Sequence, residues 1–221
     1  MTAKDEIIKR ILEISGKYSA REIFTDWVKL MALSISNSTQ MIHNRVWKER
    51  ERMYMELFKK YDSQEQKQLI DMFSLLCIAL GDKKSDVLGE IYMGTNQGNK
   101  ATGQFFTPYH LSLLTATIAI ISNPPNKNGI IEICEPSCGG GGMIIGCADI
   151  LEQQGIDYQK VLKVTCQDLD YTAVYMTYVQ LSMLGIRATV VQGDTLREPY
   201  DKRKTDSSHI YYTPAERGLL F

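Results

Sequence analysis

The sequence lacks several features that would assign the protein to a simple functional class. No Cys-x-x-Cys pair occurs among its five cysteines, and its three histidines are scattered. Neither a zinc site nor a disulfide framework is therefore predicted. No apolar run approaches the ~20 residues of a membrane span, and residues 1–6 carry no apolar signal core. We therefore expect a cytoplasmic protein with reduced thiols and no membrane partner.

An excess of charge of one sign is also missing. The chain has 25 Lys and Arg against 26 Asp and Glu, so its net charge is close to zero. Because a free-standing DNA-binding protein is usually basic, contact with DNA is expected only through a local patch or a partner subunit. The segment 45–60 holds six basic residues, which are Arg45, Lys48, Arg50, Arg52, Lys59 and Lys60. Glutamates alternate with them, which is typical of the solvated face of an amphipathic helix.

Apolar residues recur at helical spacing through residues 1–80. Ser19 and Ser63 precede two of these stretches and are predicted to be N-caps. We therefore predict a helical N-terminal domain over residues 1–82, suited to self-association or to docking. A short helical piece follows at 86–93, and the glycine- and amide-rich segment 94–100 after it predicts a loop.

Further along the chain, predicted helices alternate with short apolar strands. The helices are predicted at 109–121, 142–153 and 172–185, and the strands at 129–134, 161–167, 188–192 and 209–212. Strand–helix–strand repeats of this length indicate βαβ units on a mainly parallel sheet. The predicted fold class is therefore α/β.

Acidic residues stand at the ends of the first three predicted strands. The first strand ends in Glu135, and a glycine turn, 136–142, joins it to the next helix. Glycines let backbone amides approach a ligand, and ligands bind beyond the carboxyl ends of strands in such sheets. A structural turn explains a glycine run equally well, but the next strands end at Asp168 and Asp194, where carboxylates can meet a ribose diol and an adenine amino group. The pattern favours a nucleoside-like ligand, with Asp170 as the cap of the following helix.

Four segments in fixed order make the pattern specific: Gly103-Gln104-Phe105-Phe106-Thr107-Pro108, Glu135-Pro136-Ser137-Cys138-Gly139-Gly140-Gly141-Gly142-Met143, Gln167-Asp168 and Gly193-Asp194-Thr195-Leu196. Together they resemble the N6-adenine DNA methylase family, in particular the modification subunits of type I restriction systems and their phage or mobile-element relatives. The resemblance implies an incomplete Rossmann-like fold over residues 83–221 that uses S-adenosylmethionine (SAM) and no metal. It also implies DNA as a partner, reached through another subunit, and a specificity or restriction subunit.

The resemblance assigns the SAM site residue by residue. The family segment that packs on the methionine end of SAM is matched by Phe105, Phe106, Thr107 and Pro108. The family's glycine loop is matched by Glu135, Ser137, Gly139 and Gly141. Asp168 matches the ribose carboxylate and Asp194 the adenine contact. The family usually has Asp in place of Glu135 and often Ser in place of Gly140, and both departures are mild.

The family's catalytic motif, Asn/Asp-Pro-Pro-aromatic at the tip of the fourth strand, has no match in this sequence. Its polar group accepts hydrogen bonds from the target amine, and its ring stacks on the flipped base. Two partial substitutes, Glu198-Pro199-Tyr200 and Thr213-Pro214, fall in the expected window. The first lies too close to Asp194, and the second lacks the amide and the ring. Asn123-Pro124-Pro125-Asn126 precedes the glycine loop and is interpreted as a turn. The catalytic residues are therefore unassigned.

Two functional hypotheses remain. Only four strands precede Phe221, fewer than a complete methyltransferase sheet has, and no target-recognition region is visible. The first hypothesis is a subunit of a DNA adenine-N6 methyltransferase, truncated or completed by another chain. The second is a catalytically inactive module that binds SAM or docks on a restriction–modification or phage complex. A small-molecule or rRNA methyltransferase would share the glycine loop, but this interpretation is disfavoured because the segment Gly103–Pro108 upstream of the loop is not usual in that class.

Overall fold

The computed structural model describes residues 2–95 and 107–219. Helices form its first part: α1 (Ala3–Ile14), α2 (Ala20–Ser38), α3 (Arg45–Phe58), α4 (Ser63–Asp82) and α5 (Val87–Thr95). The second part comprises α6 (Tyr109–Ser122), β1 (Ile131–Glu135), α7 (Gly142–Gln153), α8 (Tyr158–Val161), β2 (Leu162–Asp168), α9 (Tyr171–Met183), β3 (Arg187–Gln192), the 3₁₀ helix η2 (Ser207–His209) and β4 (Ile210–Tyr212). Within the described ranges, no helix is both long and apolar enough to cross a membrane.

The helix starts follow from local capping chemistry. Ser19 caps α2 and accepts a hydrogen bond from the Glu22 amide, as predicted. The prediction of Ser63 as the cap of α4 is wrong, because Ser63 is the first helical residue. Asp62 caps α4 instead: its carboxylate accepts hydrogen bonds from two backbone amides, and the Glu65 carboxylate accepts one from the Asp62 amide. The aspartate thus completes a capping box that the neighbouring serine does not.

Two further expectations need correction. The loop predicted at 94–100 is wrong for Gly94 and Thr95, which belong to α5; the Thr95 hydroxyl donates to carbonyls of the preceding turn. The other residues of that loop lie outside the described ranges. In the basic segment of α3, Arg45 and Arg52 are exposed as expected, but Arg50 is only 2% exposed.

Arg50 joins α3 to the edge of the sheet. Its guanidinium donates to the carbonyls of Ser208 (3.1 Å) and Ile210 (2.9 Å) and to the hydroxyl of Ser36 on α2. It also stacks over the ring of Tyr211, 4.1 Å from the centroid. An edge strand presents unpaired carbonyls; Arg50 satisfies the Ile210 carbonyl of β4 and the Ser208 carbonyl of the adjacent η2. The burial of this cation is therefore explained by a contact across 160 residues of sequence.

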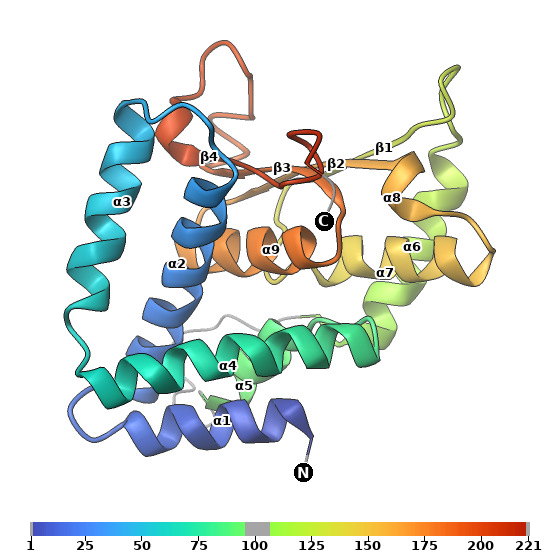
Figure 1. Cartoon of the computed structure of the whole chain (residues 1–221). Coiled ribbons are helices and arrows are strands. Elements are labelled where there is room, and N and C mark those ends of the chain that lie inside the picture. The colour runs from blue at the N-terminus through green and yellow to red at the C-terminus, as the bar shows by residue number, and fades with distance from the viewer. Residues whose placement is uncertain (1, 96–106, 220–221) are drawn as a thin grey trace.

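The sheet has the order β1-β2-β3-β4, with β1, β2 and β3 parallel and β4 antiparallel to β3. The predicted mainly parallel α/β fold is thus confirmed. Helices α7 and α9 lie together against one face of the sheet, and α2 packs against α9 (Figure 1). On the opposite face, Glu132 and Cys134 of β1 are exposed. Among the described residues, β1 has a strand neighbour on one side only.

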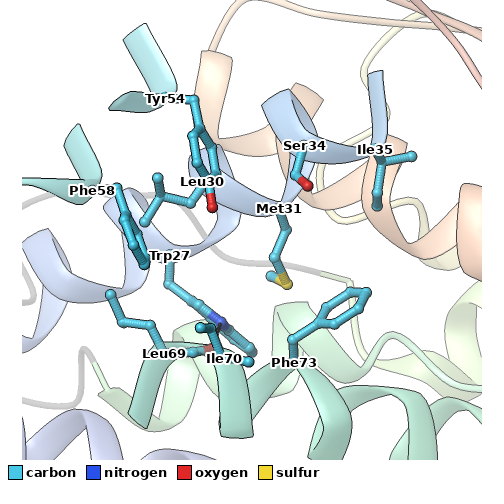
Figure 2. A pocket seen from close by; sticks show the side chains of 10 residues that line it. All are labelled: Trp27, Leu30, Met31, Ser34, Ile35, Tyr54, Phe58, Leu69, Ile70 and Phe73. Atoms are coloured by element: carbon cyan, nitrogen blue, oxygen red, sulfur yellow. Dashed lines mark hydrogen bonds between the residues drawn. The ribbon is translucent and has the colours of Figure 1, made fainter. Parts of the chain in front are cut away.

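The helical part contains an apolar groove of about 130 Å³ between α2, α3 and α4. Figure 2 shows Trp27, Met31 and Phe73 around it, and the Trp27 indole donates to the Leu69 carbonyl at 3.1 Å. Apolar side chains of all three helices line this groove, and none of the described strands contributes to it. The proposed division at residue 82 stays a prediction, since buried apolar residues of both parts form one continuous core.

Candidate functional site

A cavity of about 350 Å³ lies where β1 and β2 end. Its described lining comes from four places along the chain: the entry to α5, the start of α6, the glycine loop and the tip of β2. The lining residues are Asp86, Thr107, Ser112, Thr115, Glu135, Ser137, Cys138, Gly139, Gly140, Gly142, Met143 and Asp168. Because the carboxyl ends of parallel strands meet at one edge of a sheet, this is the position at which such folds bind ligands.

The structure brings part of the predicted site together here. The predicted residues that line the cavity are Thr107, Glu135, Ser137, Gly139 and Asp168. Pro108, Gly141 and Asp194 are described but do not line it. Phe105 and Phe106 lie outside the described residues. The role of each residue toward a ligand stays a prediction.

The glycine loop is held in place by β2 and α9. The Asp168 carboxylate accepts a hydrogen bond from the Gly139 amide at 2.9 Å, and the Thr177 hydroxyl donates to the Gly139 carbonyl at 2.9 Å. Gly141 caps α7 with φ +88°, in the left-handed region where only glycine is unstrained. A Cβ at Gly141 would also lie 3.2 Å from the Thr177 hydroxyl. Contacts with β2 and α9 therefore support the loop conformation.

Asp86 and Gln180 are the functional candidates that sequence reasoning missed. Gln180 on α9 is fully buried; its amide nitrogen donates to Asp86 (2.8 Å) and to the Gly140 carbonyl (2.6 Å), while its oxygen accepts from the Leu88 amide (3.0 Å). Asp86 is 5% exposed, lines the cavity and also accepts from the Gly89 amide at 2.9 Å. One signal was available: each is a polar residue beside an apolar stretch, where a buried polar group needs a partner.

Asp86 also explains why glycine stands at position 140. A Cβ built on Gly140 would lie 2.5 Å from one Asp86 carboxylate oxygen and 2.6 Å from the other. A Cβ on Gly142 would lie 3.3 Å from the same carboxylate. A serine at position 140 would therefore collide with Asp86. The absence of a side chain at Gly140 leaves room for the Asp86 carboxylate, and both residues line the cavity.

The cavity is acidic. Burial raises the pKa of the Asp86 carboxyl, opposed by its hydrogen bond with Gln180. Burial likewise raises the pKa of Glu135, whose carboxylate accepts from the Ser137 amide. With Asp168 these form a set of three carboxyl groups, and no Lys, Arg or His is present in the described lining. Burial disfavours the ionised forms of Asp86 and Glu135, whereas a cation or a hydrogen-bond donor favours them, so the cavity suits a cationic ligand with hydrogen-bond donors.

The tip of β3 is tied to this loop, although Asp194 does not line the cavity. The Thr195 hydroxyl donates to the Pro136 carbonyl at 2.7 Å. The Asp194 carboxylate accepts from the amides of Leu196 (3.0 Å) and Arg197 (3.3 Å), so it organises its own turn. A contact from Asp194 to an adenine ring stays a prediction.

The prediction that β4 would carry Thr213-Pro214 to the place of the missing catalytic motif is wrong. Because β4 runs antiparallel to β3, its end lies at the amino end of β3. The Thr213 hydroxyl is buried there, donating to the Ile186 carbonyl and accepting from the Ala188 amide. Apolar alternation alone does not specify strand direction, and the cavity lies at the opposite edge of the sheet.

The other substitute, Glu198-Pro199-Tyr200, follows the carboxyl end of β3. Its backbone is held by the Gln167 side chain, which donates to the Glu198 carbonyl and accepts from the Tyr200 amide, both at 3.0 Å. The Glu198 side chain is exposed and is absent from the described cavity lining. Neither substitute places a side chain in the cavity.

Comparison with known proteins identifies a family. The model of the family described as N-6 DNA Methylase matches residues 83–214. One similar solved structure is the methyltransferase subunit of a type I restriction-modification system from Streptococcus thermophilus, with 14% identity and a TM-score of 0.45 over 91% of this chain and 41% of that chain. Another is described as a class I S-adenosylmethionine-dependent methyltransferase from Listeria monocytogenes, with 16% identity and a TM-score of 0.44 over 79% of this chain and 54% of that chain. This chain thus spans about half the length of these proteins or less. No curated protein matches.

Proposed function

This chain belongs to the N-6 DNA methylase family, and from that premise we propose that its cavity binds SAM as the cofactor-binding part of a DNA adenine-N6 methyltransferase of restriction–modification type. One observation carries the proposal. Residues assigned to SAM from separate sequence segments, among them Thr107, Glu135 and Asp168, line a single cavity of about 350 Å³, a volume typical of small-molecule sites.

The residues present fit this cofactor. SAM is a sulfonium cation with an ammonium group, and Asp86 and Glu135 offer negative charge in a site without a described basic residue. Asp168 already accepts the Gly139 and Asp170 amides. A carboxylate has about four lone-pair sites, so Asp168 retains capacity for a ribose diol. Gly140 has no side chain, so only its backbone atoms face the cavity at this position.

Bound SAM would supply an activated methyl group for direct attack by the adenine amine. The contribution of this chain is to bind and orient the cofactor through the glycine loop, and to neutralise its charge with the buried carboxyl groups. No side chain in the described lining matches the group that orients the target amine. We therefore propose that DNA and this missing group are brought by a partner subunit, in the cytoplasm.

A second candidate is a catalytically inactive SAM-binding or docking module. The observation that favours it is the antiparallel direction of β4, which leaves Thr213-Pro214 at the far edge of the sheet. Methyl transfer from tritiated SAM to adenine-containing DNA separates the two candidates. Transfer that appears when a companion restriction–modification subunit is added supports the enzyme; SAM binding with no transfer under any of these conditions supports the module.

The binding proposal is tested by calorimetric titration of the full chain with SAM and S-adenosylhomocysteine. Asp168→Asn removes a charged acceptor of hydrogen bonds, which is worth about 1.5–3 kcal/mol or roughly 10- to 150-fold in affinity. Asp157→Asn is the matched control, because Asp157 caps α8 and does not line the cavity. Micromolar binding that is weakened only by Asp168→Asn is expected. Absence of binding by the unaltered chain, or equal binding by both variants, would refute the proposed site.

A further inference from the structure

A second cavity, of about 480 Å³, lies beside the carboxyl end of β3. Helices α2, α3 and α9 contribute to its walls, and η2 and β4 supply the rest of its described lining. In Figure 1, α2 lies between α3 and α9 at this end of the sheet. The described lining shares no residue with that of the first cavity. The two cavities are therefore separate sites.

Basic groups outnumber acidic groups in the second cavity, which is the reverse of the first. Its described lining holds Lys29, Arg50 and His209 against a single acid, Glu49. The Lys29 ammonium has no hydrogen bond or ion pair within the described ranges. Arg50 is 2% exposed, and its Nε–H has no hydrogen-bond partner among the residues that the structure describes. Since unpaired cations and unused donors favour acceptors, the cavity suits an anionic ligand.

Hydrogen bonds determine the tautomer of His209. The Gln192 side-chain nitrogen donates to the Leu169 carbonyl at 2.9 Å, and the Gln192 oxygen lies 2.8 Å from His209 Nδ1. Because an amide oxygen can only accept, Nδ1 carries the hydrogen. The Tyr171 hydroxyl oxygen lies 2.8 Å from the same nitrogen and therefore also accepts from it. The hydroxyl hydrogen of Tyr171 and Nε2 of His209 are then left for a ligand.

Tyrosine rings form an aromatic wall of the cavity. Tyr171, Tyr175 and Tyr211 contact one another in that order, with ring centroids 5.6 and 5.7 Å apart. Tyr175 and Tyr211 are buried, whereas Tyr171 is 38% exposed. Every nucleobase has a flat face that can stack on such a ring. The cavity therefore combines a surface for a planar base with basic groups for an anion.

We propose that this cavity binds a nucleoside monophosphate, with the base against Tyr171 and the phosphate beside Lys29 and His209. Its volume is in the range of small-molecule sites. A nucleic-acid chain is the less suitable occupant, because Glu49 is exposed at this site and the net charge of the chain is only −1. The inference does not rest on the proposed function of the first cavity.

Calorimetric titration of the full chain with guanosine 5′-monophosphate tests the site. Guanine lacks the 6-amino group that Asp194 is expected to meet in the first site, so this probe separates the two sites. Sub-millimolar binding is expected. Lys29→Gln should weaken it about tenfold or more, the value of a charge-assisted hydrogen bond. Lys48→Gln is the matched control, because Lys48 is exposed on α3 and outside the described lining.

The ring and the hydroxyl of Tyr171 are separated by two variants. Tyr171→Ala should lose most of the affinity for the nucleotide, and Tyr171→Phe, which keeps the ring, should lose less. Guanosine and inorganic phosphate should each bind at least about tenfold more weakly than the nucleotide, since each meets only part of the site.

Several outcomes would overturn the proposal. They are no binding of the nucleotide by the unaltered chain, equal affinities of Lys29→Gln and Lys48→Gln, and tighter binding of a ten-residue thymidine oligonucleotide, which would indicate a nucleic-acid surface. Asp168→Asn should leave the affinity for the nucleotide unchanged. If Asp168→Asn abolished that binding, the nucleotide would occupy the first cavity. Failure of SAM to bind would not alter these results, so the two proposals can fail separately.

Discussion

Replacing Gln180 by alanine is expected to lower the free energy of unfolding by about 3–9 kcal/mol, because three buried groups each lose a hydrogen bond and each such loss costs about 1–3 kcal/mol. The groups that lose a hydrogen bond are the Gly140 carbonyl, the Leu88 amide and the Asp86 carboxylate, which keeps its hydrogen bond from the Gly89 amide. Gln180 is fully buried, so water does not replace its hydrogen bonds without a change of structure. The change would be a large share of the 5–15 kcal/mol that typically stabilises a domain.

Urea and thermal unfolding measure this effect. For a chain of this size, each kcal/mol shifts Tm by about 2–4 °C, so a fall of roughly 6–36 °C is expected. Gln153→Ala is the matched control, because the exposed Gln153 donates a single hydrogen bond to Asp149 one turn earlier. If the free energy of unfolding of Gln180→Ala were within about 1 kcal/mol of that of the unaltered chain, roughly the value of one typical hydrogen bond, the hydrogen bonds of Gln180 would not stabilise the fold as argued.

Gln180→Glu separates hydrogen bonding from packing. The side chain keeps its size and its acceptor for the Leu88 amide, but both donors to Asp86 and Gly140 are lost, and a carboxylate then faces an acid. Burial beside Asp86 raises the pKa of the introduced carboxyl, so the folded state binds more protons than the unfolded state, and stability falls as pH rises through that window. The loss of stability of Gln180→Glu relative to the unaltered chain should be largest at neutral pH and should become smaller on acidification. A deficit independent of pH would contradict this reasoning.

The remaining predictions concern other contacts. Gly140→Ala should destabilise the fold by about 1–3 kcal/mol through overpacking, and adding Asp86→Ala should recover part of that loss in a double-mutant cycle. Arg50→Lys should lower the unfolding free energy by about 3 kcal/mol in urea, because the planar donor fork over the Ser208 and Ile210 carbonyls is lost. Asp62→Ala should cost about 1 kcal/mol of thermal stability as a lost N-cap. SAM affinity in calorimetry should rise with pH through the raised pKa of Glu135, since the ionised form attracts the cation.

Local chemistry explains why much of the fold was predictable. The strands β1, β2 and β3 are short apolar runs, and their acidic or glycine ends mark the edge of the sheet where the cavity lies. The convergence of Glu135, Gly139 and Asp168 followed from that topology. The cap of α4 was misplaced by one residue because Asp62 and Ser63 are both good capping residues, and only the return contact from Glu65 separates them.

Contacts between distant residues were not predictable. Asp86 and Gln180 are 94 residues apart, and neither alone indicates a buried hydrogen bond. The burial of Arg50 depends on edge carbonyls at Ser208 and Ile210, which no helix-face pattern reveals. The direction of β4 depends on how the loop after β3 returns, so the same apolar alternation fits both a parallel and an antiparallel strand.

The position of β1 has a kinetic consequence. Among the described strands it is bonded on one side only, whereas β2 lies between two neighbours. Amides of a singly bonded edge strand open locally at lower free energy than those of a central strand. The glycine loop continues directly from β1, so a ligand that restrains this loop should also slow the local opening of β1. The rate of amide hydrogen exchange in β1, measured relative to that in β2, should therefore report ligand binding in the cavity.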